Sequence, residues 1–313
     1  MPDIATVTIN PAVDVSTSVE KIVPVAKLRG TSQRRDPGGG GINVARVIKR
    51  LGGRGVRAIY PVGGGTGDLL RRLLDAESVD SQTFQIAGET REDFFVHEQS
   101  TALQYRFILP GPTLIDREWS EFLQLVASLD PFPRFVVASG SLPGGVPDDF
   151  YARLAAITKR RGSQIILDTS GAALAAAVAE GVDLIKPNLR EMRELTGTEP
   201  QDAGEWVAAA RRIVEMGQAS IVALTMGHLG AALVTRDRTW QAKSLPIKPL
   251  SAVGAGDSFL GALVLRLAAG TDLGAAFRYA MAAGAAALLH PGTELCRTAD
   301  VERLAEQVVI EET

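Results

Sequence analysis

Short apolar runs alternate along the chain with segments whose apolar positions repeat every three or four residues. Val44, Val47, Ile48 and Leu51, for example, have the spacing of one helical face. We predict strands at 4–9, 56–60, 135–138, 165–167, 184–186 and 221–224, and helices at 44–51, 69–74, 148–161, 188–195 and 206–216. After Gly256 the chain is predicted to be helical nearly to its end. This alternation predicts an α/β fold with a mostly parallel sheet and helices on both faces.

Two stretches depart from this alternation. Residues 12–34 contain no helical pattern, and the apolar residues from Leu103 to Leu109 occupy every second position, as in a strand. The polar tip 99–101 precedes them, so a hairpin is expected. We predict a small β-lid, formed by residues 12–34 and 84–109, that projects from a main domain formed by residues 1–11, 35–83 and 110–313. An antiparallel edge of the main sheet is the alternative.

Composition excludes several classes of protein. The 313 residues are 46% hydrophobic, and 33 Lys plus Arg against 36 Asp plus Glu give a net charge of −3, which argues against disorder and against general attraction to nucleic acid. The single cysteine, Cys296, argues against a disulfide framework and for a reducing, cytoplasmic compartment. No apolar run approaches the roughly 18 residues of a membrane span. The N-terminus shows no secretory signal pattern, so we expect neither export nor membrane contact.

Glycine is enriched, with 32 residues, and the richest run is PGGGGIN at 37–43. Successive glycines permit positive φ angles and a close approach of backbone to ligand, and the following helix directs free N–H groups at anions or hydroxyls. Asn43 can both donate and accept hydrogen bonds, which suits a sugar hydroxyl. A flexible loop is the alternative.

VGAGDS, at 253–258, opens an apolar helix. The N–H groups of Gly254, Ala255 and Gly256 can form an anion hole where negative charge develops during group transfer. Asp257 can then act as a general base toward an attacking hydroxyl, which contributes about 10²- to 10⁴-fold to a rate. Alternatively, Asp257 only caps or charges the helix N-terminus.

Two further segments follow predicted strands. Asn188 and Glu191 lie three residues apart on one helical face and can hold hydrated Mg²⁺, or they can form a capping box. The segment 224–230 can wrap a nucleotide phosphate or serve as a hairpin turn. Asp168 ends a predicted strand and receives no assigned role. P-loop, GxGxxG and GxSxG motifs are absent, which argues against a P-loop enzyme, a dinucleotide-binding enzyme and a serine hydrolase.

In this order, TINPAVD at 8–14, the run GGGGINVAR, SGSLPGG, IKPNLREM and SAVGAGDS resemble the ribokinase-like (PfkB) carbohydrate kinase family over nearly the whole chain. TINPAVD and SGSLPGG resemble its phosphosugar branch. The unbroken PGGGGINVAR and LQYRFILPG look most like the PfkB-type 6-phosphofructokinases.

This resemblance implies roles residue by residue. Asp257 matches the catalytic base, and Gly254, Ala255 and Gly256 match the anion hole. The positions that match substrate-binding residues are Asp14, Lys27, Gly39, Gly40, Asn43, Arg91, Arg106 and Ser139. The positions on the nucleotide side are Lys186, Asn188, Thr225, Gly227, Gly230 and Lys248. Mg²⁺ is expected at Asn188 and Glu191, through water, and K⁺ at Ser251, Val253, Ala287 and Gly292.

The implied activity is ATP- and Mg²⁺-dependent phosphorylation of fructose 6-phosphate to fructose 1,6-bisphosphate in glycolysis, by a homodimer joined through the β-lid. The alternatives are 1-phosphofructokinase, tagatose-6-phosphate kinase and, in a different class, a noncatalytic sugar- or nucleotide-binding regulator. His290 and Glu294 depart from the residues that relatives often have around the cation loop, which puts K⁺ activation in doubt.

Overall fold

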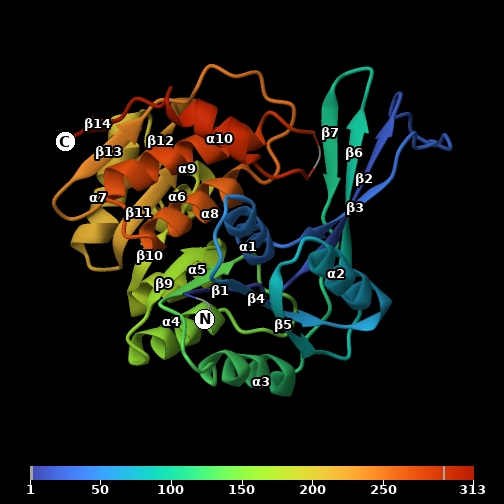
Figure 1. The fold of residues 1–313 in the computed structure, drawn as a ribbon, viewed down its shortest axis with the longest axis horizontal. Coiled ribbons are helices and arrows are strands. Elements are labelled where there is room, and N and C mark those ends of the chain that lie inside the picture. The colour runs from blue at the N-terminus through green and yellow to red at the C-terminus, as the bar shows by residue number, and fades with distance from the viewer. Residues whose placement is uncertain (1–2, 292) are drawn as a thin grey trace.

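A computed structural model describes residues 3–291 and 293–313. A large ten-stranded sheet between two layers of helices carries a second, separate sheet of four strands (Figure 1). The large sheet consists of β1 (Ile4–Val7), β4 (Val56–Val62), β5 (Asp80–Gln85), β8 (Phe135–Ser139), β9 (Gln164–Asp168), β10 (Val182–Ile185), β11 (Ala219–Thr225), β12 (Ala231–Val234), β13 (Thr239–Ala242) and β14 (Glu311–Glu312).

The large sheet has the order β14-β13-β12-β11-β10-β9-β8-β1-β4-β5. All pairings from β11 to β5 are parallel, and only β12, β13 and β14 pair antiparallel. The prediction of a mostly parallel sheet is therefore confirmed. The chain order reverses at β1, which lies between β8 and β4. In open parallel sheets a ligand crevice forms at such a point, beside the carboxyl ends of the strands.

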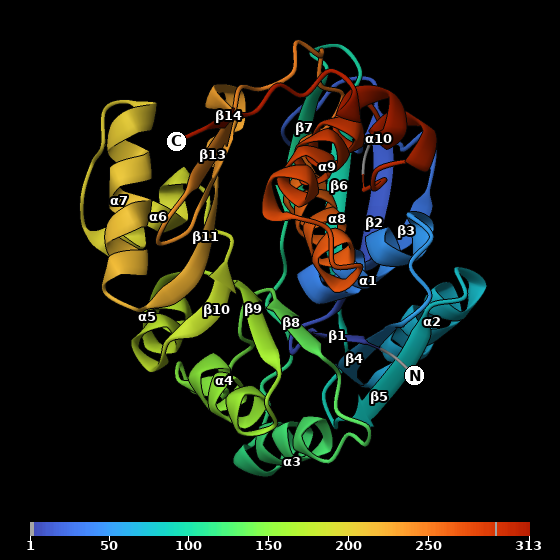
Figure 2. The ribbon, with the colours of Figure 1, turned by 60° about the vertical axis from the view of Figure 1, so that its left-hand side comes forward.

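Helices cover both faces of this sheet (Figure 2). One face is covered by α1 (Gly40–Arg50), α2 (Gly64–Ala76), α8 (Ala255–Ala268), α9 (Leu273–Ala287) and α10 (Thr298–Ala305). The other face is covered by α3 (Asp116–Ala127), α4 (Phe150–Arg160), α5 (Gly171–Glu180), α6 (Leu189–Thr196) and α7 (Ala203–Glu215). Within residues 3–291 and 293–313, no helix is long and apolar enough to cross a membrane.

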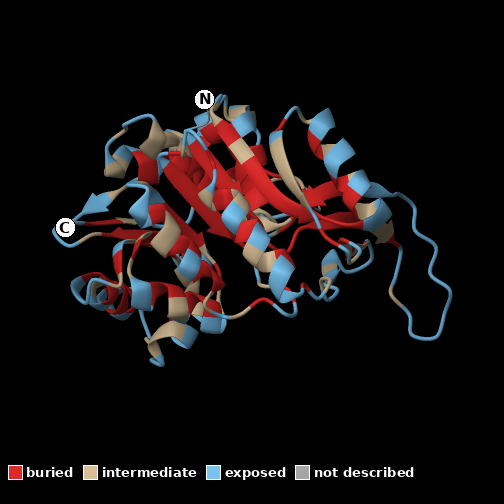
Figure 3. Ribbon diagram, turned by 90° about the horizontal axis from the view of Figure 1, so that it is seen from below, coloured by how far each residue is buried: buried red, intermediate tan, exposed pale blue. Residues whose placement is uncertain are grey.

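Alternate side chains of each central strand belong to two different hydrophobic cores, one on each face of the sheet. In β8, Phe135 and Val137 belong to the cluster that includes α8 and α9, whereas Val136 and Ala138 belong to the cluster that includes α4 and α7. Successive side chains of a strand point to opposite faces, so a continuous apolar run is what a strand covered on both faces requires. Figure 3 shows the central strands almost wholly buried and the outward sides of the helices exposed.

The second sheet has the order β3-β2-β6-β7 and stands apart from the large sheet. Its strands are β2 (Ala12–Val19), β3 (Arg34–Gly38), β6 (Arg91–Glu98) and β7 (Leu103–Phe107). The predicted hairpin is present as β6 and β7, and the alternative of an edge on the main sheet is wrong. We call these four strands, with the loops between them, the lid. Residues 35–38 belong to it and residues 84–85 to the large sheet, so the strand limits differ slightly from the expected boundaries.

Several elements were not predicted. They are β5, β13, β14, α3 and α5, while α2 begins at Gly64 rather than at Leu69. Alanine dominates α5, and glycine occupies three of the first four positions of α2, so neither stretch shows an amphipathic helical pattern.

Candidate active site

Three polar side chains meet where neighbouring strands end. Ser139 ends β8, Asp168 ends β9, and Lys186 directly follows β10. Lys186 Nζ lies 3.0 Å from Asp168 Oδ1, and Ser139 Oγ lies 3.5 Å from Asp168 Oδ2. Sequence reasoning gave no role to Asp168. Its position at the end of a strand was the available signal, because carboxyl ends of parallel strands share one edge of a sheet.

The glycine run spans the end of β3 and the start of α1 rather than a flexible loop, so that alternative is wrong. Gly39 has a φ of +108°, which L side chains rarely adopt. A Cβ on Gly40 would lie 2.1 Å from Ser139 Oγ, and one on Gly38 would lie 2.2 Å from Asp14 Oδ1. Glycine is therefore needed here for the close approach of Asp14 and Ser139, two of the side chains predicted to bind sugar.

Asp257 lies in the first turn of α8, after Gly254 in the left-handed conformation with φ of 74°. Its side chain makes no capping bond and instead accepts a hydrogen bond from Asn43, whose Nδ2 lies 2.9 Å from Asp257 Oδ2. The first backbone bond of the helix joins Ser258 N–H to the Gly254 carbonyl at 2.8 Å. The N–H groups of residues 255–257 precede that bond and face the end of the helix, where an anion is stabilised.

The pKa of Asp257 is raised to about 6, first by burial and then by the nearby charge of Asp168, against the hydrogen bond from Asn43 and the charges of Lys186 and Arg46. A carboxyl with such a pKa is mostly ionised at neutral pH and still basic enough to accept a proton from a hydroxyl. Its environment is therefore suited to a general base.

Lys186 brings a buried positive charge to the same place. Burial would lower the pKa of Lys186, but the ion pair with Asp168 raises it above its ordinary value. A Cβ on Gly256 would lie 3.3 Å from Lys186 Nζ, so the ammonium group lies against the start of α8. The structure thus brings together Asp257, Gly256, Asn43 and Lys186 from distant parts of the sequence.

Asn188 and Glu191 form the capping box of α6. Asn188 Oδ1 accepts from Glu191 N–H at 3.0 Å, and Glu191 Oε2 accepts from Asn188 N–H at 3.0 Å. Burial raises the pKa of Glu191, and the charge of Asp168 adds to this, against the Asn188 N–H and two nearby cations. The capping interpretation is confirmed, and a cation near Glu191 and Asp168 would relieve their mutual repulsion. Within the described chain, no three His, Cys, Asp or Glu side chains cluster as metal ligands.

The segment between β11 and β12 is a hairpin connection. Met226 N–H donates to the Gly230 carbonyl at 2.8 Å, and Gly227 and Gly230 have φ angles of 59° and 97°. Thr225, at the end of β11, donates its N–H to the Pro187 carbonyl at 3.0 Å. This bond places the hairpin beside Asn188, so the two segments predicted to bind nucleotide adjoin each other.

The lid contributes a row of three carboxylates. Asp14 on β2 is directly opposite Asp36 on β3 and Asp93 on β6. The pKa of Asp14 is raised to about 7, mainly by burial and also by the charges of Asp93 and Asp36, against those of Arg46 and Arg91. Across the described residues, Asp14 makes no side-chain hydrogen bond.

Two predicted phosphate-binding arginines lie on the lid. Arg91 donates to the Leu109 and Asn10 carbonyls at 3.1 and 3.3 Å, while its buried Nε has no partner among the described residues. Arg106 is exposed on β7 and forms no ion pair in the described part of the chain. By strand register Arg106, Arg91 and Asp14 share one face of the lid sheet.

The profile of the pfkB family carbohydrate kinases matches residues 3–300 of the chain. This protein belongs to the pfkB family. The ATP-dependent 6-phosphofructokinase isozyme 2 of Mycobacterium tuberculosis is 45% identical over 305 residues, which cover 97% of this chain and 89% of that protein. The 1-phosphofructokinase of Bacillus subtilis is 32% identical, covering 90% of this chain and 91% of that one.

Crystal structures of phosphofructokinase-2 from Escherichia coli agree with the fold of this pfkB kinase. The complexes with fructose-6-phosphate and with potassium are each 38% identical and cover 98% of this chain and 99% of theirs, with TM-scores of 0.92 and 0.93. A further structure of that enzyme is a tetrameric inhibited form. The fold is ribokinase-like, and the chain is a phosphotransferase that acts on a carbohydrate.

The remaining predicted positions of this pfkB kinase differ in exposure. Lys27, in the loop between β2 and β3, and Lys248, before α8, are exposed. Among the positions matched to K⁺, Ser251 and Ala287 are buried, Val253 is partly exposed, and Gly292 lies outside the described residues.

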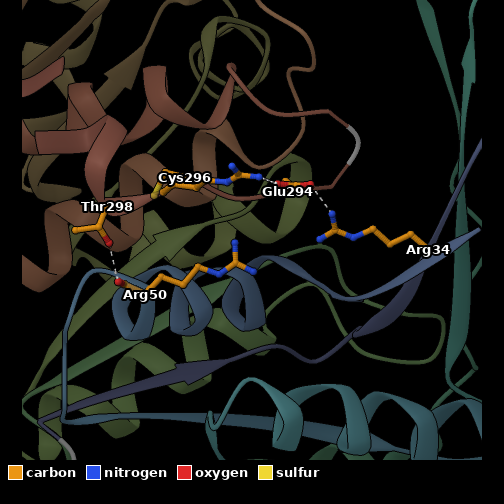
Figure 4. A pocket seen from close by; sticks show the side chains of 6 residues that line it. Arg34, Arg50, Glu294, Cys296 and Thr298 are labelled. Carbon is orange, nitrogen blue, oxygen red and sulfur yellow. Dashed lines mark hydrogen bonds and ion pairs between the residues drawn. The ribbon is translucent and has the colours of Figure 1, made fainter. Parts of the chain in front are cut away.

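The two residues that depart from the family's cation loop have partners of their own. His290 Nε2 lies 3.0 Å from Asp300 Oδ2. Glu294 pairs with Arg34 at 2.6 Å and with Arg297 at 2.8 Å. The Arg34 pair joins the lid to this loop. A pocket of about 420 Å³ opens beside it, lined by Arg34, Arg50, Glu294, Cys296, Arg297 and Thr298 (Figure 4). None of the predicted catalytic residues lines that pocket.

Proposed function

We propose that this kinase transfers the γ-phosphoryl group of ATP to fructose 6-phosphate and forms fructose 1,6-bisphosphate, as a cytoplasmic enzyme of glycolysis. The observation that carries the proposal is the arrangement of Asp257 at the N-terminus of α8, with Asn43 bonded to its carboxylate and Lys186 beside the helix start. The relatives named 6-phosphofructokinase support the choice of sugar.

Asp257 is the proposed general base. It takes the proton of the sugar 1-hydroxyl as the oxygen attacks the γ-phosphorus, and the bond from that phosphorus to the bridging oxygen of ADP breaks. Phosphoryl transfer depends mostly on positioning and charge stabilisation. The N–H groups at the start of α8 are proposed to stabilise the negative charge. Gly254, Ala255 and Gly256 form the proposed anion hole for the transferring group.

ATP is proposed to bind along the carboxyl ends of the strands, at Lys186, Asn188, Thr225, Gly227, Gly230 and Lys248. Mg²⁺ fits beside Asn188 and Glu191, through water, because hard oxygen donors and the repulsion between Glu191 and Asp168 favour a divalent cation there. When bound, it neutralises charge on the phosphates. Backbone carbonyls around Ser251, Val253 and Ala287 are the proposed site for K⁺.

The sugar phosphate is proposed to lie between the lid and the glycine run. Asp14, Asn43, Ser139 and the backbone of Gly39 and Gly40 would bind hydroxyls. Arg91, Arg106 and Lys27 would bind the existing phosphate, since guanidinium groups bind phosphate through forked hydrogen bonds. The unpartnered Nε of Arg91 supports this assignment, because a bound phosphate oxygen would satisfy it.

A panel of sugars tests the proposal. ADP release is measured with fructose 6-phosphate, fructose 1-phosphate, tagatose 6-phosphate, fructose and ribose, each at equal concentration with ATP and Mg²⁺. The highest kcat/KM is expected for fructose 6-phosphate. A higher value for fructose 1-phosphate or tagatose 6-phosphate would instead favour 1-phosphofructokinase or tagatose-6-phosphate kinase. No ADP release with any sugar would favour a binding protein.

The proposed quaternary structure is a homodimer joined through the outer face of the lid. Four side chains on this face are exposed by 36–56%: Phe94, Leu103, Tyr105 and Phe107. By register they lie on the face opposite Asp14 and Arg106. A second copy would cover this apolar surface, which otherwise contacts water.

A further inference from the structure

One charged side chain lies wholly inside the protein next to the proposed base. Arg46, on α1, is 1% exposed and is the largest of the fully buried side chains among the described residues. Keeping an arginine charge in the interior costs several kcal/mol before its partners compensate, and an apolar side chain of similar size would often give equal or greater stability. The contacts of Arg46 therefore call for a reason other than packing.

The guanidinium of Arg46 uses its donors in three directions. Nε and Nη2 donate to the two oxygens of Glu77 at 2.9 and 2.6 Å, as a bidentate pair. Nη1 donates to the Pro37 carbonyl at 2.8 Å and to Asn43 Oδ1 at 3.1 Å. Glu77 thus fixes the plane of the guanidinium, because a planar fork that is held at two atoms cannot rotate.

The contact with Asn43 determines which way that amide faces. Arginine has donors only, so it must meet the oxygen of the Asn43 amide and not its nitrogen. The nitrogen is then the atom presented to Asp257, where Nδ2 donates at 2.9 Å. With the opposite orientation, a carbonyl oxygen would face the carboxylate of Asp257, and its hydrogen bond would be lost.

We propose that Arg46, held by Glu77, is a positioning residue for catalysis: it orients the Asn43 amide, and through it fixes the carboxylate of Asp257. The chain of contacts runs from Glu77 to Arg46, Asn43 and Asp257. The inference rests on the proposed role of Asp257 as base.

The test compares Arg46→Lys with a control on the same helix, Arg50→Lys. Lysine keeps the charge but cannot bond to Glu77, the Pro37 carbonyl and Asn43 with a fixed fork. Arg50 lies one turn further on and also contacts Glu77, at 3.3 Å, but not Asn43, and its side chain lines the pocket in Figure 4. We expect Arg46→Lys to lower kcat about 10-fold with the KM for ATP within about twofold, and Arg50→Lys to leave kcat unchanged.

Two further measurements separate positioning from a structural role. In the Asp257→Asn background, Arg46→Lys should reduce kcat by less than twofold, because residues that act as one unit are not additive. The pKa of the Asp257 carboxyl, followed by carbon NMR and assigned by its loss in Asp257→Asn, should rise in Arg46→Lys. Glu77→Gln, at the less buried end of the network, is the milder variant if Arg46→Lys does not fold, with the same directions expected.

An unchanged kcat per folded molecule together with an unchanged Asp257 pKa would overturn the inference, even if the melting temperature falls. A full 10-fold loss in the Asp257→Asn background would overturn it as well. Absence of wild-type turnover on every sugar counts against the proposed function instead, and the NMR titration then decides the inference by itself.

Discussion

The two sides of the active site hold their carboxylates in different ways. On the α8 side, Asp257 accepts a hydrogen bond from Asn43, which Arg46 and Glu77 hold in turn. On the lid side, Asp14 lies between Asp36 and Asp93 without such a bond, and its pKa is raised to about 7, against about 6 for Asp257. The α8 side is organised by the protein itself, whereas the lid side has polar groups that a ligand would satisfy.

The difference extends beyond the carboxylates. The start of α8 packs against α1 and α9 in a continuous core. The lid sheet has one polar face toward the site and an exposed apolar face away from it. We expect that chemistry and sugar binding can be damaged independently, because Asp257 is held from α1 whereas Asp14 and Arg106 lie on the lid sheet. Four predictions test that separation, from the largest expected effect to the smallest.

Removing the base should affect chemistry alone. Asp257→Asn keeps the shape of the side chain and can still accept from Asn43, but it cannot accept a proton. We expect kcat to fall at least about 10²-fold, with the melting temperature within a few degrees of wild type and the KM for sugar phosphate little changed. Steady-state kinetics and thermal unfolding check this. Near-normal turnover would remove Asp257 from the mechanism.

Placing a charge on the outer face of the lid should break the dimer. Phe107 is 52% exposed there, and Phe107→Asp would bury a carboxylate against apolar groups of a second copy. We expect the dissociation constant measured by sedimentation to rise at least about 30-fold. Met216→Asp is the control, because Met216 is 71% exposed but lies at the end of α7, away from the lid. A wild-type protein that is monomeric at micromolar concentration would contradict the proposed dimer.

Removing a lid arginine should affect sugar binding and leave chemistry intact. Arg106→Ala is expected to raise the KM for fructose 6-phosphate about 10-fold or more, with kcat nearly unchanged, because a charge-assisted bond to phosphate is lost. Arg35→Ala is the matched control, since Arg35 is exposed on β3 with its side chain on the opposite face of the sheet. Equal KM values for the two variants would exclude the phosphate-binding role of Arg106.

The two sides should also titrate separately. Both carboxyls have raised pKa values, so each gains a proton, and loses its ability to accept one, as pH falls. In the free enzyme, kcat/KM should decline below about pH 7 through Asp14, whereas kcat should decline only below about pH 6 through Asp257. Asp14→Asn should remove the upper decline. A single shared break in both profiles would contradict the separation of the two sides.

The raised pKa of Asp14 also determines how its contribution to the stability of the folded protein changes with pH. Its pKa is about 7 in the folded protein and about 4 when unfolded. The folded state therefore binds more protons between these values, and Asp14 makes folding less favourable as pH rises through that window. The buried Asp14 carboxylate reduces stability at neutral pH, where a bound ligand would offset the cost.

Local sequence determined a large part of the fold. The apolar strands β1, β4, β8 and β11 and the amphipathic helix α1 were predictable because their patterns reflect burial on two faces or on one. The helix start at VGAGDS was predictable as well, because an apolar run follows it, whereas the role of Asp257 as base comes from the family resemblance and stays a prediction. Elements with weak patterns, such as the alanine-rich α5 and the polar β5, were missed because neighbours, and not their own side chains, decide their state.

Tertiary structure alone decided which residues meet. Asn43 and Asp257 are 214 positions apart, and Asp168, Lys186 and Ser139 come together only because β8, β9 and β10 are neighbours in the sheet. Arg46 stands in the same sequence motif as Asn43, but the neighbouring residues in the sequence do not indicate that its charge is buried or that Glu77 holds it. Pairings between distant segments depend on strand order and packing, and these are properties of the whole chain, which no single segment contains.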